Sequence, residues 1–231
     1  MKHLELLSKT KQSLMYHVKD YSLITDKLIA SVDWPKNIPV LFFDFKPFRP
    51  AGGVAKHKVK GRYIVRYVFG GFTKRLKPAG KPLKTSPITL RAPKNQQEAY
   101  SITKKSIAEH AAADKRLYGE SFKQETRRYL ANFKKHTRSA LLFKNGRNVG
   151  IATLYDNTRW DGKPCSTITW LRLDKRLPKA EYQDALYQAT KWCVENSKET
   201  MAVFNHADEI EDHKFETVMG LRPYRINFRR K

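Results

Sequence analysis

The chain has 231 residues and a formal net charge of +24, because 46 Lys and Arg outweigh 22 Asp and Glu. Hydrophobic residues make up 40% of it and aromatic residues 12%, which suffices to bury a core and excludes a disordered basic tail. No apolar run approaches the length of a membrane span, so we expect a soluble cytoplasmic protein that does not bind membranes.

The first 87 residues combine apolar patterns with many turn residues. Apolar side chains at helical spacing predict a helix within residues 4–31, with a break near residue 20. The runs 38–45 and 62–69 predict strands, the second closed by Gly70 and Gly71. A connector rich in Pro and Lys, residues 77–87, is the best candidate boundary, so we expect a basic extension over 1–87 and a second domain over 88–231.

The most informative stretch runs from residue 45 to residue 97. It holds fourteen Lys and Arg and no acidic residue, with aromatic residues between the cations. Such a density of one charge repels itself unless a polyanion neutralises it, so we expect nucleic acid as the partner, double-stranded DNA and also tRNA. Frequent Pro and Gly exclude one long amphipathic helix of the kind that binds membrane surfaces. The residues expected to bind DNA are Lys56, Lys58, Lys60, Arg62, Arg66, Lys74, Arg75 and Lys77.

From residue 88 onward, predicted strands and helices alternate. Strands are expected at 88–92, 140–144, 149–155, 166–174, 201–205 and 223–228, the second and third joined by a tight turn at Asn145 and Gly146. Helices are expected from Asn95 to about 118, from 121 to about 136, from Pro178 to about 196, and from 208 to 219 before Gly220. The fold class is therefore α/β (α+β), and the strand-helix-strand unit from 168 to 204 predicts locally parallel pairing.

This order of elements resembles the Gcn5-related N-acetyltransferase (GNAT) family over residues 88–231. The segment from Asn205 to Leu221 is similar to the family's last strand-helix unit. The resemblance implies a mixed twisted sheet flanked by helices and an acyl transfer reaction, with acetyl-CoA as the donor. Two departures matter: the family's Gly-rich turn for pyrophosphate is replaced by residues 174–182, which contain no glycine, and the family's Tyr general acid is Glu216 here.

Charged side chains can replace that turn. We expect Arg172, Lys175, Arg176 and Lys179 to bind the donor, the last three beside the N-terminus of a helix. A solvated basic face would explain the same residues. The candidate catalytic residues are Asp156 or Asp174 as the general base, with Asn205 or Tyr224 orienting the acyl carbonyl.

The whole chain also resembles phage proteins that convert adenine in DNA to N6-(carbamoylmethyl)adenine and so defeat host restriction endonucleases. That resemblance implies a phage enzyme in the host cytoplasm. An adenine swung out of the duplex would need a stacking pocket with a hydrogen-bond acceptor. Phe42, Asp44 and Phe48 can supply it, although a buried strand followed by a turn explains them equally well.

The donor of the carbamoylmethyl group is open. Glycyl-tRNA supplies every atom of the group, whereas acetyl-CoA lacks the nitrogen and would require a metal-assisted radical step. His206, Asp208 and His213 are weak candidates for an iron site, since a capped helix explains them as well. Two other classes remain as alternatives: a GNAT-like acetyltransferase acting on a protein or small molecule, and a non-catalytic protein that coats DNA.

Overall fold

In the computed structural model of the chain, the described residues are 4–9, 14–18, 40–43, 63–113, 126–127, 129–131, 133, 137–158, 162–206 and 218–230. The chain splits into two compact units, one made of residues 1–76 with 202–231 and the other of residues 77–201. The expected functional division into 1–87 and 88–231 stays a prediction. None of the described helices is both long enough and apolar enough to cross a membrane.

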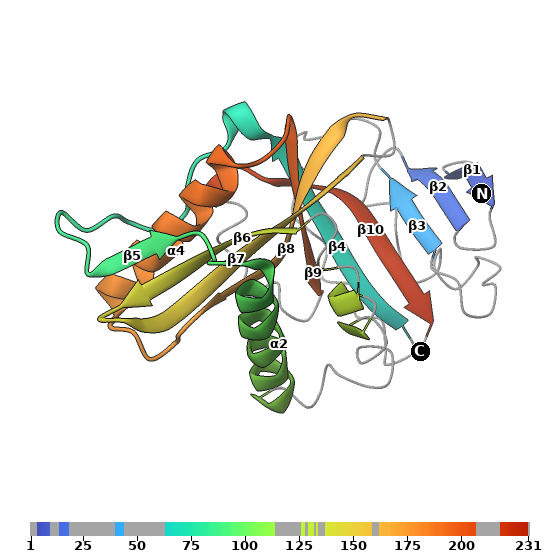
Figure 1. The fold of residues 1–231 in the computed structure, drawn as a ribbon. Helices are drawn as coiled ribbons and strands as arrows, with labels where there is room; N and C mark the ends of the chain where they lie inside the picture. Colours follow the sequence, from blue (N-terminus) through green and yellow to red (C-terminus); the bar gives the residue numbers. More distant parts are fainter. Residues whose placement is uncertain are drawn as a thin grey trace. The chain divides into compact units, whose positions relative to one another are not determined.

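The first unit is built on strands from both ends of the chain (Figure 1). Its spatial order is β1 (Leu4–Lys9), β2 (Leu14–Val18), β3 (Val40–Phe43), β10 (Arg222–Arg230), β4 (Tyr63–Phe72) and β9 (Thr200–His206), which belongs mostly to this unit. Strand β10 is antiparallel to both β3 and β4, and β2 is parallel to β3. The C-terminal strand thus completes the sheet that the N-terminal strands begin.

Two sequence predictions for this unit are wrong. Instead of a helix, residues 4–9 and 14–18 form two antiparallel strands. The apolar residues Leu14, Tyr16 and Val18 also alternate with period two, and in so short a segment this period cannot be separated from the helical one. Strand β4 does not stop at Gly70 but continues to Phe72, while a Cβ on Gly71 would lie only 2.7 Å from Leu76 Cδ2.

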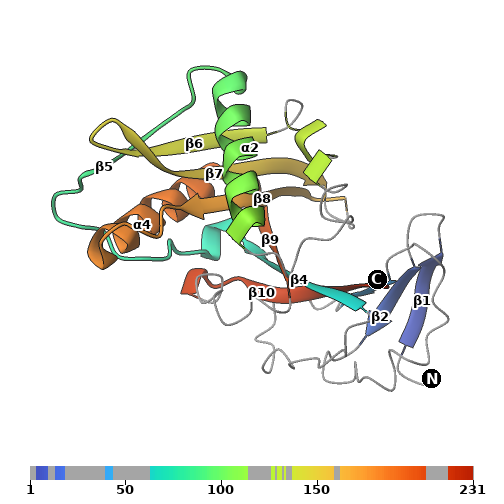
Figure 2. The ribbon, with the colours of Figure 1, turned by 90° about the horizontal axis from the view of Figure 1, so that it is seen from below.

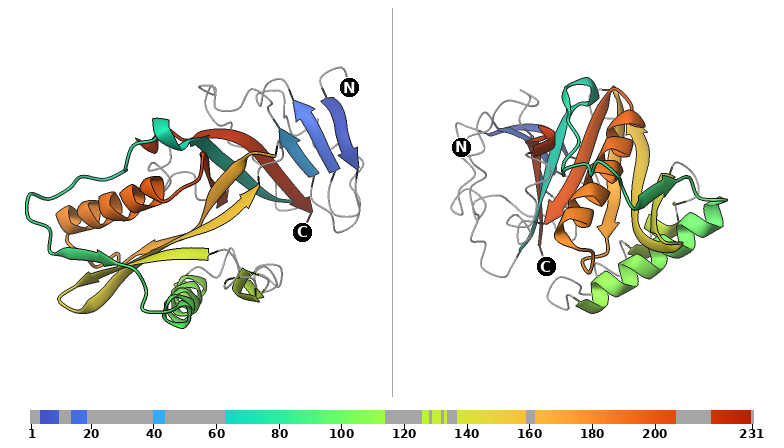
Figure 3. Two further views of the ribbon diagram at one scale, coloured as in Figure 1. Left: turned by 45° about the horizontal axis from the view of Figure 1, so that its top comes forward. Right: turned by 90° about the vertical axis from the view of Figure 1, so that its left-hand side faces the viewer.

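The second unit contains an antiparallel sheet with the spatial order β8 (Pro164–Leu173), β7 (Arg147–Thr158), β6 (Thr137–Lys144) and β5 (Ile88–Arg91). Helices α2 (Gln96–Ala113) and α4 (Lys179–Glu195) cover opposite faces of this sheet (Figures 2 and 3). The predicted α/β class, a mixed twisted sheet with flanking helices, is confirmed.

Local sequence signals account for several boundaries in this unit. The β6–β7 hairpin turns at Asn145 and Gly146, whose φ angles are 49° and 75°, as expected from the Asn-Gly pair. Asn95 caps α2 because its Oδ1 accepts a 2.9 Å hydrogen bond from the Glu98 backbone N–H. Helix α4 begins after Pro178 and ends before Asn196, within one residue of the prediction.

One part of the apolar core of this unit lies between the sheet and α4, while Leu141, Ile151 and Phe133 are buried on the α2-facing side. Directly opposed residues of neighbouring strands point to the same face, so the register places a continuous set of small and aliphatic side chains on the α4-facing side. Fully or almost fully buried members of this set are Ala140, Leu142, Ala152, Leu154, Ile168 and Leu173 from the sheet, with Ala185, Ala189 and Cys193 from α4. The α2-facing side of the same strands differs in composition and carries the polar groups described next.

Candidate functional site

The centre of strand β8 contains a bulge. Thr153 of β7 pairs with Trp170 and Leu154 with Ile168, so Thr169 is an extra residue without a partner in β7. Its hydroxyl lies 2.8 Å from that of Thr153, and the Tyr129 hydroxyl lies 3.1 Å from Thr153 Oγ1 and 3.2 Å from Thr169 Oγ1. We call Tyr129, Thr153 and Thr169 the hydroxyl cluster.

The hydroxyl cluster stays uncharged near neutral pH. Burial raises the pKa of Tyr129, and its hydrogen bonds with Thr153 and Thr169 only partly offset that effect. The cluster also makes a fourth contact, from Thr153 Oγ1 to the Trp170 carbonyl oxygen at 3.3 Å. Each of the three hydroxyls has one proton to donate, so only three of the four contacts can be hydrogen bonds at the same time. A bound group can therefore replace one internal hydrogen bond of the cluster.

Further hydroxyls line the same face of the sheet. Ser139 of β6 is opposite Thr153, Thr137 is opposite Tyr155, and the Trp170 indole N–H donates to Ser106 Oγ of α2 at 2.9 Å. Within the described part of the chain, three buried hydroxyls on this side have no hydrogen-bond partner: Thr103, Thr137 and Ser139. A buried polar group without a partner costs about 1–3 kcal/mol, so these hydroxyls are candidates for hydrogen bonds to water or to a ligand.

Carboxylates are missing from this face. Side chains alternate between the two faces along each strand, and the register shows which residues of β6, β7 and β8 face α2. None of these described residues is Asp or Glu. The charged residue there is Arg172, opposite Ile151 and half-buried. The described β6, β7 and β8 residues of this face thus offer hydrogen bonds to neutral groups and include no carboxylate.

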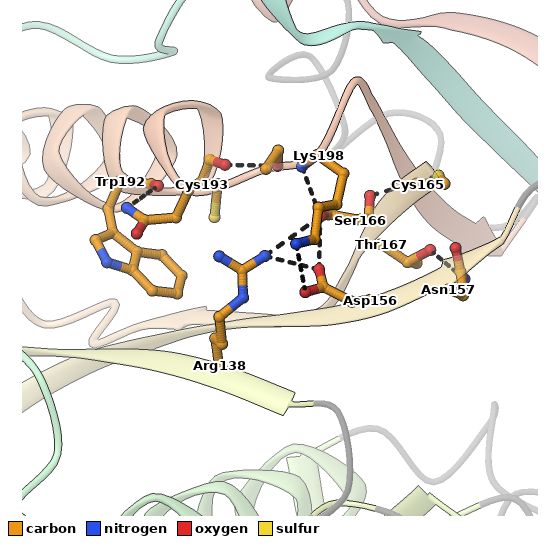
Figure 4. A network of polar contacts seen from close by, with 11 residues as sticks. Arg138, Asp156, Asn157, Cys165, Ser166, Thr167, Trp192, Cys193 and Lys198 are labelled. Carbon is orange, nitrogen blue, oxygen red and sulfur yellow. Dashed lines mark hydrogen bonds and ion pairs between the residues drawn. The ribbon is translucent and has the colours of Figure 1, made fainter. Parts of the chain in front are cut away.

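Asp156, one of the two candidate bases, lies at the far end of β7 and is occupied by a polar network (Figure 4). Its Oδ1 accepts hydrogen bonds from Arg138 Nη2 and Ser166 Oγ, both at 2.7 Å, and Lys198 Nζ lies 3.9 Å from Oδ2. Partial burial opposes ionisation of Asp156, but the hydrogen bonds from Arg138 and Ser166 outweigh it and lower its pKa. A carboxylate held in this way is a weak proton acceptor.

Asp174, the other candidate base, follows β8 at the opposite end. Arg176 donates to it from its backbone N–H and from its guanidinium at 2.9–3.0 Å, and Arg147 Nη2 lies 2.6 Å from Oδ2. The hydrogen bonds from the Arg176 side chain are the main cause that lowers the pKa of Asp174. Arg176 is therefore engaged within the loop, whereas Lys175 and Lys179 are exposed beside the start of α4.

The two carboxylates cannot serve one reaction centre. Asp156 is opposite Ser166, and Asp174 follows Leu173, so eight residues of strand, or about 26 Å, separate them along β8. The hydroxyl cluster lies between these two positions. Neither assignment as general base is settled by the geometry, and both stay predictions.

The other predicted site residues divide into three groups. Lys74, Arg75 and Lys77 are exposed, as a phosphate contact requires. Phe42, Arg66, Asn205, His206 and Tyr224 lie in strands β3, β4, β9 and β10, but their side chains lie outside the described part. Outside the described residues altogether are Asp44, Phe48, Lys56, Lys58, Lys60, Arg62, Asp208 and His213.

A metal centre is not found among the residues that the structure describes. No group of three or more His, Cys, Asp or Glu is placed to hold an ion within them. The candidates Asp208 and His213 fall outside this part, and the side chain of His206 does too, so the iron site stays a prediction.

Sequence reasoning missed the hydroxyl cluster. Thr167 and Thr169 flank Ile168 and alternate with it, which signals a strand with one polar face. The bulge that brings Thr169 to Thr153 has no sequence signature in this strand, and Tyr129 comes from a separate helical segment.

No family model matches the chain, and no curated protein does either. Among solved structures, a functionally unknown conserved protein from Staphylococcus epidermidis is 10% identical, with a TM-score of 0.48, over 97% of this chain and 92% of its own. A GCN5-related N-acetyltransferase from Kribbella flavida is 12% identical (TM-score 0.46, 93% and 80% covered). Another from Sphaerobacter thermophilus is 11% identical (TM-score 0.45, 98% and 76% covered). These likenesses concern the arrangement of strands and helices and assign no activity.

Proposed function

We propose that the chain is an acyl-type transferase that modifies the N6 position of adenine in double-stranded DNA. The proposal combines the predicted GNAT-like order of elements with a net charge of +24. The order β5-α2-β6-β7-β8-α4-β9-β10 agrees with that prediction wherever the elements are described. A strongly cationic chain with an enzyme-like α/β half fits a catalyst acting on a polyanion better than a protein that only coats it.

The observation that carries the proposal is the neutral, hydroxyl-lined face at the β8 bulge. An aliphatic amine acceptor arrives as an ammonium ion, which requires a carboxylate partner and a base to become reactive. The described β6, β7 and β8 residues of this face include no Asp or Glu, and they include Arg172. The exocyclic amino group of adenine is uncharged and donates hydrogen bonds, while the ring nitrogens of the base accept them, so the base suits Thr and Tyr hydroxyls, which do both.

The specific product rests on resemblance. The length, the charge and the element order resemble the Mom DNA-modification protein of phage Mu, which implies N6-(carbamoylmethyl)adenine as the product. Restriction endonucleases read the N6 edge of adenine in the major groove, and a bulky substituent there removes a donor that they need. Protection of phage DNA from the host would be the biological result.

For the donor, we favour glycyl-tRNA over acetyl-CoA. The loop before α4 lacks glycine, Pro178 cannot donate a backbone hydrogen bond, and Arg176 is engaged with Asp174. A pyrophosphate would thus find few donors among these residues, whereas Lys175 and Lys179 are exposed and can meet a larger polyanion.

The chemistry of the favoured route balances as follows. Adenine N6 attacks the glycyl ester carbonyl, the N6 proton leaves, and the tRNA 3′-terminal hydroxyl is released. The free glycyl amine then attacks C6 through a five-membered ring, and the original nitrogen departs as the amide of the isomeric carbamoylmethyl group. Adenine labelled with ¹⁵N at N6 tests the route, since the label should finish in the amide; label on the ring-attached nitrogen would exclude it.

The test of the function is mass spectrometry of nucleosides from DNA of cells that express the chain. We expect an adenosine derivative heavier by the carbamoylmethyl group, together with resistance of that DNA to restriction enzymes that cut at adenine-containing sites. Thr153→Val and Thr169→Val are the matched variants, because each removes one hydroxyl of the cluster and keeps the shape of the side chain. An unmodified nucleoside profile in cells that contain folded protein would refute the proposal.

A further inference from the structure

The segment expected to be a loose connector is held firmly against α4. We call residues 77–87 the strap. The Ala79 N–H donates to Thr190 Oγ1 at 2.9 Å, and the same hydroxyl lies 3.1 Å from the Ala79 carbonyl oxygen. Lys81 N–H donates to the Gln183 carbonyl at 3.1 Å, and Leu83 N–H donates to Asp184 Oδ1 at 3.0 Å. Every second residue of the strap is thus fixed through its backbone.

The groups on α4 that hold the strap are buried, and Thr190 Oγ1 also lies 2.7 Å from the Leu186 carbonyl oxygen within the helix. Asp184 is 1% exposed and Thr190 is 0% exposed. Asp184 also accepts hydrogen bonds from Ser86 Oγ and from Gln188 Nε2. Gly80 has a φ of 88°, and a Cβ there would lie 2.3 Å from the Gln183 carbonyl oxygen, so only glycine permits this close approach.

The strap turns its cations outward. Lys77, Lys81 and Lys84 are exposed, and none of the three forms an ion pair with any described residue. Some cations of this unit are paired, such as Lys144 with Glu181 and Arg147 with Asp174, whereas Lys104, Lys105, Lys175 and Lys179 are exposed like the strap lysines. The strap therefore displays positive charge that the rest of the unit leaves uncompensated.

We propose that the strap is a preformed surface for the phosphate backbone of duplex DNA, in which Lys81 and Lys84 bind phosphates and Thr190 and Asp184 are positioning residues. The proposal rests on the proposed function only for the identity of the partner. The eight residues from Lys77 to Lys84 include three exposed lysines, and a phosphate backbone neutralises such a run of cations. Because the backbone is already ordered, binding costs less conformational entropy than it would for a flexible basic loop.

Charge-matched variants of the full chain test the surface. We would measure binding to a 20-base-pair duplex as a function of salt for Lys81→Ala/Lys84→Ala and for Lys104→Ala/Lys105→Ala. The second pair lies exposed on α2, on the opposite face of the sheet, and lowers the net charge equally. Each lost phosphate contact should reduce the slope of log K against log salt by about 0.9, so the strap variant should lose roughly 1.8 and bind some 50-fold more weakly at 0.1 M salt.

The α2 pair should stay within about threefold of the wild type with its slope unchanged, since a distant charge acts only through screened electrostatics. Equal losses in both double variants would overturn the proposal. So would tighter strap-dependent binding to tRNA or to single-stranded DNA than to the duplex.

A second comparison tests the positioning role without removing a cation. Thr190→Val deprives the Ala79 N–H and carbonyl of their partner, whereas Thr190→Ser keeps the hydroxyl. We expect Thr190→Val to bind the duplex about fivefold more weakly, with nearly the same dependence of log K on log salt. Thr190→Ser should bind as the wild type does. Hydrogen exchange of the wild-type protein gives a check that needs no variant: the amides of Ala79, Lys81 and Leu83 should be protected, and rapid exchange would refute a rigid strap.

Failure of this inference can be told apart from failure of the proposed function. If DNA is modified in cells but the Lys81→Ala/Lys84→Ala variant binds the duplex as the wild type does, only the inference about the strap is refuted. If duplex binding depends on Lys81 and Lys84 but the nucleoside profile is unmodified, the inference about the strap holds and the proposed transferase function is refuted.

Discussion

The two faces of the β5–β8 sheet are made by the same strands but differ in how their buried polar groups are paired. The α4-facing side packs Leu142, Leu154 and Ile168 against small residues of the helix, and all are at most 3% exposed. The α2-facing side presents hydroxyls near the β8 bulge, and within the described residues several of these are buried without a partner. The α2-facing side also buries Leu141 and Ile151, but among the described residues it retains unpaired hydroxyls at a cost in stability.

This difference indicates that the α4-facing side mainly stabilises the fold and that the α2-facing side is suited to binding. Close-packed aliphatic faces stabilise a fold and gain nothing from unpaired polar atoms. Buried hydroxyls that lack partners are retained where a ligand or water completes them. Changes on the α4-facing side should hence affect folding, and changes on the α2-facing side should affect binding more than folding.

The largest effect is expected for Leu154→Ala. Leu154 is fully buried on the α4-facing side, so truncation removes apolar contacts and leaves a cavity, at a cost of about 2–5 kcal/mol in the free energy of unfolding. Urea denaturation followed by circular dichroism measures it. Its chain neighbour Thr153 faces the other way, and Thr153→Val serves as the control that should alter stability far less. Similar losses for the two variants would contradict the contrast between the faces.

The opposite sign is expected for Thr137→Val on the α2-facing side. The Thr137 hydroxyl is buried and without a hydrogen-bond partner among described residues, and valine has the same shape. Removing the unpaired group should raise the free energy of unfolding by about 1–2 kcal/mol. If the hydroxyl binds substrate, the yield of modified nucleoside should fall in the same variant. A variant that loses stability instead would show that the hydroxyl is already satisfied by internal water.

The sequence predicted the packed face much better than the polar one. The hairpin turn at Asn145 and Gly146 and the start of α4 after Pro178 depend on the backbone preferences of these residues, so they can be predicted from the sequence alone. The hydroxyl cluster depends on a register shift that inserts Thr169, and register is decided by packing across strands far apart in the chain. Asp156 and Asp174 both looked like strand-end carboxylates, and only the antiparallel register assigns them to opposite ends.

A moderate effect is expected at Asp156, which interrupts the α4-facing side near its edge. Asp156→Asn should cost about 1 kcal/mol at pH 7, because the pairs with Arg138 and Ser166 are partly open to solvent. The pKa of Asp156 is lowered in the folded state, so its contribution is complete above the unfolded value near 3.8 and is lost as pH falls through the folded value. The stability difference between wild type and variant should therefore shrink as the pH falls below 3.8. If Asp156→Asn instead abolishes catalysis without changing stability, that result would support Asp156 as the general base.

The smallest effect concerns the start of α2, the helix that covers the hydroxyl face. Glu98 accepts hydrogen bonds from Arg91 and from the Lys94 backbone N–H, and these lower its pKa to about 2. The stabilisation it provides is present above pH 4.5 and is lost between 4.5 and about 2, so the first turn of α2 should loosen in that window. NMR titration of the Glu98 carboxyl and hydrogen exchange of the Glu98 amide measure the effect. Helix α4 has no side-chain cap at its start, and its amides serve as the comparison in the same exchange experiment. If both helices loosened together, their attachment to the sheet would be one cooperative unit, and the functional separation of the two faces would lose its structural basis.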